Sequence, residues 1–268
     1  MEKFQNYGAL DQAYVLERLF HPRREDPGRL PQSDRVDVMI PVGQGVELGA
    51  SFYFNSHSAP IVLFFHGNGE IVSDYDDLGQ YFTRAGLNFF VVDYRGYGRS
   101  SGLPEVSSMM TDSHVILDFL ISYKEKNHYT GPVCIMGRSL GSAPALELAV
   151  NSGHEIHCLI IESGFAFASP LLGILGIDPV SIGFREEQGF ENLEKIKRLK
   201  NPCLIIHAEF DHIIPFSDGQ ALYDACPSST KFLLEIKGAN HNDIFFRGMI
   251  PYLEQVGKFC FMNPGGSR

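Results

Sequence analysis

The sequence predicts an α/β fold built on a mostly parallel, doubly wound sheet, and three observations support this prediction. From residue 60 onward, short continuous apolar runs alternate with helix-length amphipathic segments. The runs are apolar on both faces, which is typical of parallel strands covered by helices. The chain has 268 residues, of which 44% are hydrophobic and 20% are charged. That length suits one full domain and is short for two.

The segments before this alternation predict an N-terminal extension and an antiparallel hairpin. We expect residues 1–35 to form a short helix and an irregular arm, because helical spacing of apolar residues gives way to a stretch rich in proline and charge. Two strand candidates, 36–40 and 46–54, follow and are joined by a Gly-Gln-Gly turn. The α/β domain is expected to cover 36–262, and 263–268 to form a flexible tail.

Six apolar runs mark the remaining strands: 61–65, 89–92, 133–136, 158–161, 203–206 and 231–234. The segments between them carry apolar stripes at helical spacing. A C-terminal helix is expected to be bent or broken near Pro251. Alternating strands and helices predict right-handed crossovers, so that the carboxyl ends of the parallel strands meet at one edge of the sheet. Chemistry in such sheets gathers at that edge.

The first chemical motif lies at the end of the run 133–136. Residues 137–141 read Gly-Arg-Ser-Leu-Gly, directly after a strand and before the expected helix 142–150. A Gly-x-Ser-x-Gly string in that context is a nucleophile elbow, in which a tight turn presents the serine hydroxyl. Side chains at the two flanking positions would collide with neighbouring backbone, which accounts for glycine at both. The pattern predicts Ser139 as a nucleophile.

A serine hydroxyl needs a base to take its proton, and the base needs a partner that orients it. In this kind of site the acid comes later in the chain than the serine, and the histidine follows the acid. Asp211 lies in the loop after the run 203–206, and His241 follows the last strand. Both positions fall at the same sheet edge as the elbow. The order predicts Asp211 as the orienting acid and His241 as the general base.

A tetrahedral oxyanion also needs hydrogen-bond donors. The backbone N–H of Leu140, the residue after the nucleophile, is the first expected donor. The second is expected from the loop after the first parallel strand, which reads His-Gly-Asn-Gly-Glu over residues 66–70. We expect the N–H of Asn68, since the glycines on both sides let the backbone approach the elbow.

These motifs together resemble those of the α/β-hydrolase superfamily over about residues 36–260. The loops that match are His66-Gly67-Asn68-Gly69, Asp93 to Ser100, the elbow, Glu209 to Pro215 and Asn240-His241. Within the superfamily the chain looks most like small-lid enzymes grouped with monoglyceride lipases, acyl thioesterases and serine aminopeptidases. The resemblance implies the α/β-hydrolase fold and hydrolysis of an ester, thioester or amide without a metal or organic cofactor.

Two further questions concern charged residues near the elbow. Glu162 closes the strand 158–161, where some relatives carry their acid, although the motif around Asp211 matches better. Alternatively, Glu162 pairs with Arg138 beneath the elbow in a structural role. Asp93 and Arg95 are expected to brace the loop beside the oxyanion hole as scaffold residues.

A lid is expected at about residues 164–190, where members of the family carry an insertion. The segment is short and apolar as far as about residue 184, which favours an acyl chain or a small hydrophobic ester as the ligand. The alternative is that it only packs on the core. Ile213, Phe216 and Ile244 are expected to help line a pocket.

The leading functional hypothesis is therefore a carboxylic ester or thioester hydrolase that acts through an acyl-enzyme on a small-molecule substrate. A serine aminopeptidase or amidase is the second hypothesis. It needs a carboxylate for the substrate amine, and Glu70, Glu162, Glu186 or Glu187 are the candidates. The third is a non-enzymatic binding protein on a hydrolase scaffold, against which the complete Ser–Asp–His set argues.

Composition excludes other classes of partner. The formal net charge is −10, and no Lys/Arg-rich run is present, so a nucleic-acid partner is not expected. No apolar stretch is long enough to span a bilayer, and no secretory signal is seen. The five cysteines are odd in number and show no zinc-ligand spacing, so we expect free thiols, no metal site and a cytoplasmic location. The sequence makes no prediction of the oligomeric state.

Overall fold

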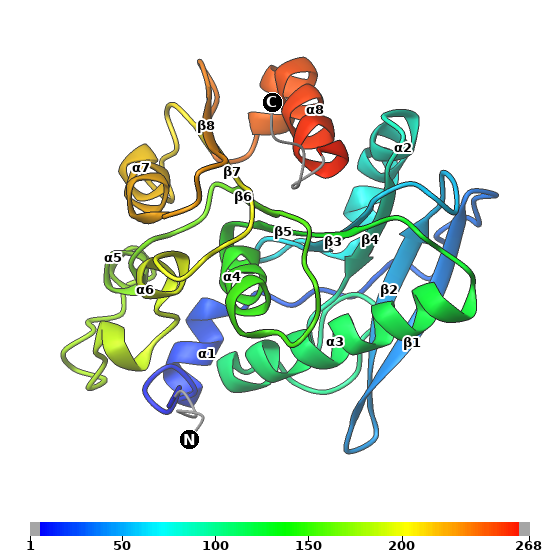
Figure 1. Cartoon of the computed structure of the whole chain (residues 1–268). Helices are drawn as coiled ribbons and strands as arrows, with labels where there is room; N and C mark the ends of the chain where they lie inside the picture. The colour runs from blue at the N-terminus through cyan, green and yellow to red at the C-terminus, as the bar shows by residue number, and fades with distance from the viewer. Residues whose placement is uncertain (1–5, 263–268) are drawn as a thin grey trace.

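The computed structural model describes residues 6–262, so the predicted tail 263–268 lies outside the described residues. The described residues form one sheet of eight strands in the order β1-β2-β4-β3-β5-β6-β7-β8 (Figure 1). The strands are β1 (Arg35–Gly43), β2 (Val46–Tyr53), β3 (Ile61–Phe65), β4 (Asn88–Val92), β5 (Val133–Arg138), β6 (Leu159–Glu162), β7 (Cys203–Ala208) and β8 (Lys231–Ile236).

Pairing within the sheet confirms the predicted fold class. β1 and β2 form an antiparallel hairpin, and β2 pairs antiparallel with β4. All pairs from β4 to β8 are parallel. Every residue of β3, β4, β5, β6 and β7 is buried, as expected for strands covered on both faces. The carboxyl ends of these parallel strands point to the same edge of the sheet.

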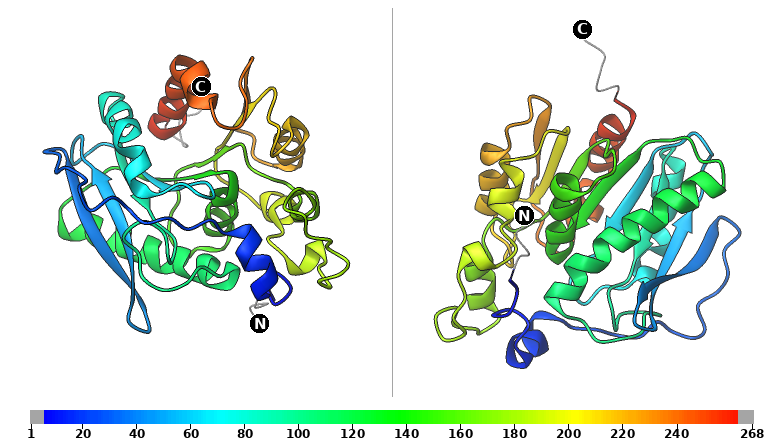
Figure 2. Two further views of the ribbon diagram at one scale, coloured as in Figure 1. Left: turned by 180° about the vertical axis from the view of Figure 1, so that it is seen from behind. Right: turned by 60° about the horizontal axis from the view of Figure 1, so that its bottom comes forward.

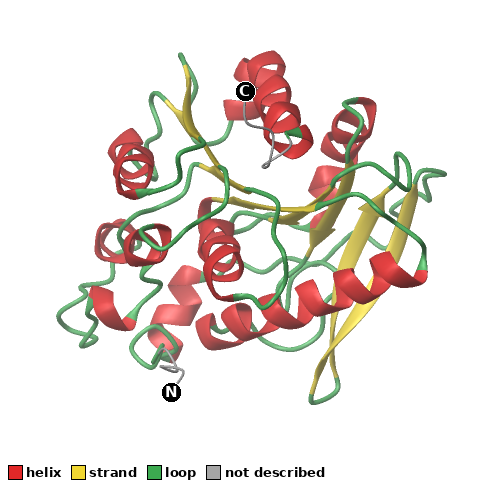
Figure 3. Ribbon diagram, in the orientation of Figure 1, coloured by secondary structure: helices red, strands yellow, loops and turns green. Residues whose placement is uncertain are grey.

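Helices cover both faces of the sheet (Figure 3). The α-helices are α1 (Ala13–Leu19), α2 (Asp76–Arg84), α3 (Val106–Lys126), α4 (Ser142–Asn151), α5 (Ala168–Ile174), α6 (Asn192–Ile196), α7 (Phe216–Ala225) and α8 (Ile244–Phe261). Three short 3₁₀ helices are η1 (Val72–Tyr75), η2 (Ser139–Gly141) and η3 (Glu186–Gln188). The apolar core divides between the two faces: one part packs against α2 and α8, and the other packs against α1, α3, α4 and α7.

The last helix is interrupted as the sequence predicted, but the interruption lies before the proline. Within α8, Gly248 has φ −112° and ψ 16°, which is not helical. Pro251 follows three residues later inside the same helix. Because a proline ring collides with the carbonyl of the preceding turn and supplies no N–H, the chain bends upstream of the proline. A Cβ at Gly248 would lie 2.5 Å from the side chain of Ile236, so the close approach to β8 also requires glycine.

The segment between β6 and β7 contains α5, η3 and α6, and it lies beside the N-terminal helix α1 (Figure 2). Residues 20–34 run as irregular chain from α1 to the hairpin and make one isolated bridge, between Arg24 and Gly98. This route places the end of α1 near the loops that follow β3 and β4. Among residues 6–262, no helix has the length and apolar character needed to cross a bilayer.

Candidate active site

The turn after β5 has the strained geometry expected of a nucleophile elbow. Ser139 has φ 51°, in the left-handed region that residues other than glycine rarely adopt. A Cβ at Gly137 would lie 2.1 Å from the carbonyl oxygen of Gly141. A Cβ at Gly141 would lie 2.1 Å from the carbonyl oxygen of Phe65 in β3. Neither contact is possible, so both glycines are required by the approach of neighbouring backbone.

Three predicted residues from separate loops meet at this turn. His241 Nε2 lies 3.1 Å from the hydroxyl oxygen of Ser139. On the other side of the ring, His241 Nδ1 lies 2.7 Å from Oδ2 and 2.9 Å from Oδ1 of Asp211. All three residues are buried. Groups in this arrangement can act as a nucleophile, a base and a carboxylate that orients the base.

Backbone donors fix the carboxylate in this arrangement. Asp211 Oδ1 accepts hydrogen bonds from the N–H groups of Ile213, at 3.0 Å, and Ile214, at 2.8 Å. Burial alone would raise the pKa of Asp211, but the hydrogen bond and charge of His241, together with these N–H groups, outweigh it and lower the pKa. The carboxylate is therefore ionised at neutral pH, and as an acceptor it favours the His241 tautomer that carries the proton on Nδ1.

The alternative acid, Glu162, takes part in a different set of contacts. Its Oε1 accepts a hydrogen bond from Nη1 of Arg138 at 2.7 Å, and its Oε2 accepts one from the hydroxyl of Tyr252 at 2.5 Å. Both of its oxygens are thus engaged away from the ring nitrogen that faces Asp211. The sequence suggested that Glu162 could pair with Arg138 in a structural role, and the structure brings these two side chains together.

Asn68 and Leu140, the expected donors to an oxyanion, line the same cavity as Ser139. The Asn68 side chain is held in place by the N-terminal arm. Its Nδ2 donates to the carbonyl of Leu19 at 2.7 Å, and its Oδ1 accepts from the N–H of His21 at 3.0 Å and from the hydroxyl of Tyr97 at 2.7 Å. The backbone N–H of Asn68 donates no hydrogen bond within the described residues.

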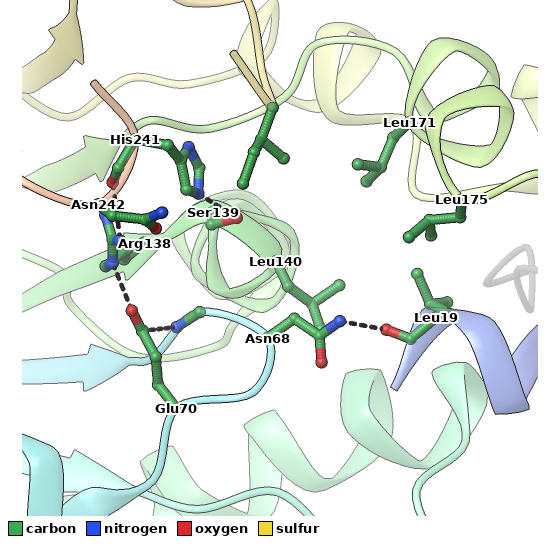
Figure 4. A pocket seen from close by; sticks show the side chains of 12 residues that line it. Leu19, Asn68, Glu70, Arg138, Ser139, Leu140, Leu171, Leu175, His241 and Asn242 are labelled. Atoms are coloured by element: carbon green, nitrogen blue, oxygen red, sulfur yellow. Dashed lines mark hydrogen bonds and ion pairs between the residues drawn. The ribbon is translucent and has the colours of Figure 1, made fainter. Parts of the chain in front are cut away.

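A cavity of about 200 Å³ opens in front of Ser139 (Figure 4). One part of its wall is polar and belongs to the loops that carry the predicted residues. The other part is apolar and comes from Leu19 at the end of α1, Leu140, Ile213, and Leu171 and Leu175 in and beyond α5. The cavity therefore combines a reactive hydroxyl with space for an apolar group.

Several lining residues were not identified from the sequence. Leu19 comes from a helix more than a hundred residues from the elbow, and no local signal marks it. Glu70, in the loop after β3, was considered from the sequence only as a carboxylate for a substrate amine, and its pairing with Arg138 was not predicted. Of the three predicted pocket residues, Ile213 lines this cavity and Ile244 lines a second cavity that shares Arg138 with it, whereas Phe216 lines neither.

Of the two predicted scaffold residues, Asp93 lies where the sequence analysis expected it and Arg95 does not. Asp93 lies beside the loop as expected: its Oδ1 accepts a hydrogen bond from Val72 N–H at 2.9 Å and lies 3.5 Å from His66 Nε2. Arg95 instead faces α3, where it forms two hydrogen bonds with Asp112, at 2.7 and 2.8 Å.

The five cysteines are free and buried. Among residues 6–262, one group of side chains has ligand atoms close enough to share a metal ion, namely Cys134, Cys158 and Cys260, whose sulfur atoms lie within 4.8 Å of one another. They pack among apolar side chains of the core between the sheet and α8, which carries Cys260, and none lines the cavity at Ser139. The expectation that the site uses no metal or organic cofactor stays a prediction.

Sequence comparisons give the relationships of the chain. A family model described as serine aminopeptidase, S33 matches residues 56–177. The α/β-hydrolase domain-containing protein 17C of Xenopus tropicalis is 34% identical over 205 residues, which are 74% of this chain and 60% of that protein. The α/β-hydrolase domain-containing protein aho-3 of Caenorhabditis elegans is 32% identical over 80% of this chain and 60% of that protein. The chain thus spans about three-fifths of the length of these relatives.

Solved structures share the fold at low identity. The Pyrococcus furiosus esterase Pf2001 superposes with a TM-score of 0.73 at 18% identity, covering 89% of this chain and 97% of the esterase. A soluble variant of the Saccharomyces cerevisiae monoglyceride lipase, in complex with a substrate analogue, gives 0.68 at 19% identity over 88% and 99% of the two chains. At these identities the likeness concerns the fold.

Proposed function

The chain belongs to the α/β-hydrolase superfamily, and on that premise we propose that it cleaves a carboxylic ester or thioester with Ser139 as nucleophile, His241 as general base and Asp211 as the orienting acid. The observation that carries the proposal is the continuous hydrogen-bond chain from Asp211 through His241 to the Ser139 hydroxyl, which opens onto a partly apolar cavity. A purely structural turn has no use for all three groups in this order.

The chemistry follows from the positions of the protons. Ser139 Oγ attacks the acyl carbon while His241 Nε2 takes its proton, and Asp211 stabilises the imidazolium that forms. The carbonyl oxygen becomes an oxyanion beside the N–H groups proposed as donors, those of Asn68 and Leu140. The N-terminus of η2 and α4 adds positive dipole there. The imidazolium then protonates the leaving alcohol or thiol, and water repeats the sequence on the acyl-enzyme.

The lining of the cavity supports an acyl group as the part of the substrate that is bound. Leu171 and Leu175 belong to the segment 164–190, and we propose that this segment serves as a lid over the acyl chain. The two structural neighbours are named as an esterase and a monoglyceride lipase, and these names are consistent with an ester as the substrate. Five buried free thiols are typical of a reducing compartment, and we propose the cytoplasm as the location.

The matching family model is described as serine aminopeptidase, which keeps that function as a second candidate. An aminopeptidase needs a carboxylate free to bind the substrate amine. Three of the four carboxylates considered for that role have other partners: Glu70 and Glu162 pair with Arg138, and Glu186 accepts the N–H groups of Ala168 and Ser169 at the start of α5. The ester or thioester is therefore the better supported substrate.

The first experiment measures hydrolysis of p-nitrophenyl esters from acetate to decanoate by the wild type, Ser139→Ala and Ser108→Ala. Ser108 is a buried serine of α3 whose hydroxyl donates to the Glu105 carbonyl, so it controls for the loss of a buried hydroxyl. We expect activity and fluorophosphonate labelling in the wild type and Ser108→Ala, and neither in Ser139→Ala. The preferred chain length then reports the size of the cavity.

Other outcomes distinguish the competing functions. Labelling without ester cleavage would redirect the assay to thioesters and to aminoacyl-arylamides, and turnover of the arylamides alone would favour the peptidase. Absence of labelling in folded wild-type protein would support a non-enzymatic binding protein and contradict the proposal.

A further inference from the structure

The guanidinium of Arg138 connects the loops that surround Ser139. Arg138 is the last residue of β5 and immediately precedes the serine, and its side chain is 10% exposed. Nε donates to Oε1 of Glu70 at 2.9 Å, Nη1 donates to Oε1 of Glu162 at 2.7 Å, and Nη2 donates to the carbonyl oxygen of His241 at 2.9 Å. Figure 4 shows Arg138 beside His241, with its contact to Glu70. One side chain therefore contacts three separate segments.

The contact with Glu70 reaches the loop that carries Asn68. Oε2 of Glu70 accepts a hydrogen bond from the N–H of Gly67 at 2.6 Å and one from the hydroxyl of Tyr75 at 2.5 Å. Gly67 directly precedes Asn68, so the position of the proposed oxyanion donor depends on Glu70 and hence on Arg138. The same guanidinium is bonded to the main chain of the proposed general base.

The charges of this network are buried at an electrostatic cost. Burying an ion pair removes two charges from water, and well-packed apolar residues often stabilise a fold as much or more. Here one cation lies between two carboxylates. Burial alone would raise the pKa of Glu70, but the charge of Arg138 and hydrogen bonds from Tyr75 and Arg138 outweigh it and lower the pKa to about 2. Glu70 is thus ionised at neutral pH.

The geometry of arginine suits such a network. The guanidinium presents its donors in a rigid planar fork, so three acceptors bound to it keep fixed directions relative to one another. Lysine carries the same charge as a single flexible point and has no such fork. Replacing Arg138 with lysine keeps the positive charge next to the two carboxylates and removes the fixed geometry.

We propose that Arg138 is a positioning residue of the active site, which holds the main chain of His241 and, through Glu70, the loop of Asn68 in register with Ser139. This inference rests on the proposed function, since it concerns the same site. Misplacing reacting groups by about 1 Å costs about 100-fold in rate. The loss falls on the chemical step, because Arg138 and Glu70 lie at the polar end of the cavity, away from its leucine wall.

The test compares Arg138→Lys and Arg138→Met with the wild type on a p-nitrophenyl ester that the wild type cleaves. The fraction of active sites is counted by titration with a fluorophosphonate, so that unfolded protein does not enter the rate. We expect kcat per active site to fall at least 10-fold in Arg138→Lys and about 100-fold in Arg138→Met, with KM changed less than threefold. If Arg138→Met does not fold, Arg138→Lys alone carries the test, because its charge is retained.

Arg95→Lys is the matched control, because Arg95 also forms charged hydrogen bonds with a buried carboxylate, that of Asp112, but contacts no residue of the cavity. Its kcat should equal that of the wild type. A kcat for Arg138→Lys within threefold of the wild type, or an equal loss in Arg95→Lys, would overturn the inference. Failure of the proposed function is a distinct result, since the wild type itself would then show no activity that Ser139→Ala removes.

Discussion

Replacing Asp211 with asparagine removes the charge of the proposed orienting acid at nearly constant shape. In the native site Oδ1 accepts the N–H groups of Ile213 and Ile214, and Oδ2 lies 2.7 Å from Nδ1 of His241. The oxygen of asparagine must occupy the Oδ1 position, because an NH₂ group there would face two N–H donors. The NH₂ group then faces Nδ1 of His241 and forces that nitrogen to accept a hydrogen bond.

The consequence is a histidine in the wrong tautomer. Its proton moves to Nε2, the nitrogen 3.1 Å from the hydroxyl of Ser139, where it can no longer take the serine proton. The corresponding Asp→Asn change in a Ser–His–Asp triad lowers kcat by about 10⁴-fold. Since Oδ1 of Asp211 also lies 2.9 Å from Nδ1, part of the native tautomer can persist. We therefore expect a loss of about 10³- to 10⁴-fold, or about 4 to 5.5 kcal/mol of transition-state stabilisation.

The assay is kcat/KM on the preferred p-nitrophenyl ester, with Asp218→Asn as the control. Asp218 is also a buried carboxylate whose Oδ1 accepts two backbone N–H groups, those of Ala166 and Phe167, but it bonds no histidine. Asp218→Asn should keep wild-type activity. Activity of Asp211→Asn within tenfold of the wild type would refute the assignment of the acid, as would an equal loss in both variants.

Three further predictions concern Glu70, Gly141 and Leu175. The pKa of Glu70 falls from 4.5 to about 2 on folding, so the ionised carboxylate stabilises the fold above pH 4.5 and this stabilisation is lost as the pH falls to 2. The difference in unfolding free energy between the wild type and Glu70→Gln should therefore be about 3 kcal/mol larger above pH 4.5 than below pH 2. Urea unfolding across this range checks it, and a difference independent of pH would contradict it. Gly141→Ala should destabilise the protein by more than about 2 kcal/mol, because the new Cβ would lie 2.1 Å from a carbonyl oxygen of β3. Gly153→Ala, whose new Cβ would meet no atom within 4 Å, should leave stability nearly unchanged, and thermal unfolding of the two variants checks both expectations. Leu175→Phe should shift the preferred ester to a shorter chain by filling the cavity. Ile174→Phe, at an exposed neighbouring position, should leave the preference unchanged.

The sequence by itself determined the elements and the order of the sheet-edge loops. Runs such as 61–65 and 203–206 are apolar at every position, and such a pattern is compatible with strands buried on both faces. The elbow is equally local, since Gly137 and Gly141 are fixed by the approach of backbone to a tight turn. Because parallel strands end at one edge, the order of serine, acid and histidine along the chain already implied their proximity.

Only the tertiary structure decided which side chains complete the site. Glu162 ends β6 and Asp211 follows β7, at the same edge of the sheet, and the sequence alone left Glu162 as an alternative acid. The structure pairs Glu162 with Arg138 and Tyr252, and leaves Nδ1 of His241 to Asp211. Such a choice depends on the directions of side chains that are distant in sequence, and no local pattern encodes those directions.

The position of the N-terminal helix at the cavity was also decided only by the tertiary structure. Leu19 lines the cavity, and its carbonyl holds the side chain of Asn68, although 48 residues lie between them. The sequence showed an amphipathic helix followed by an irregular arm, which fixes local structure but not its destination. Where that arm packs depends on the apolar surface that the folded sheet and its helices leave uncovered, and that surface exists only once the rest of the chain has folded.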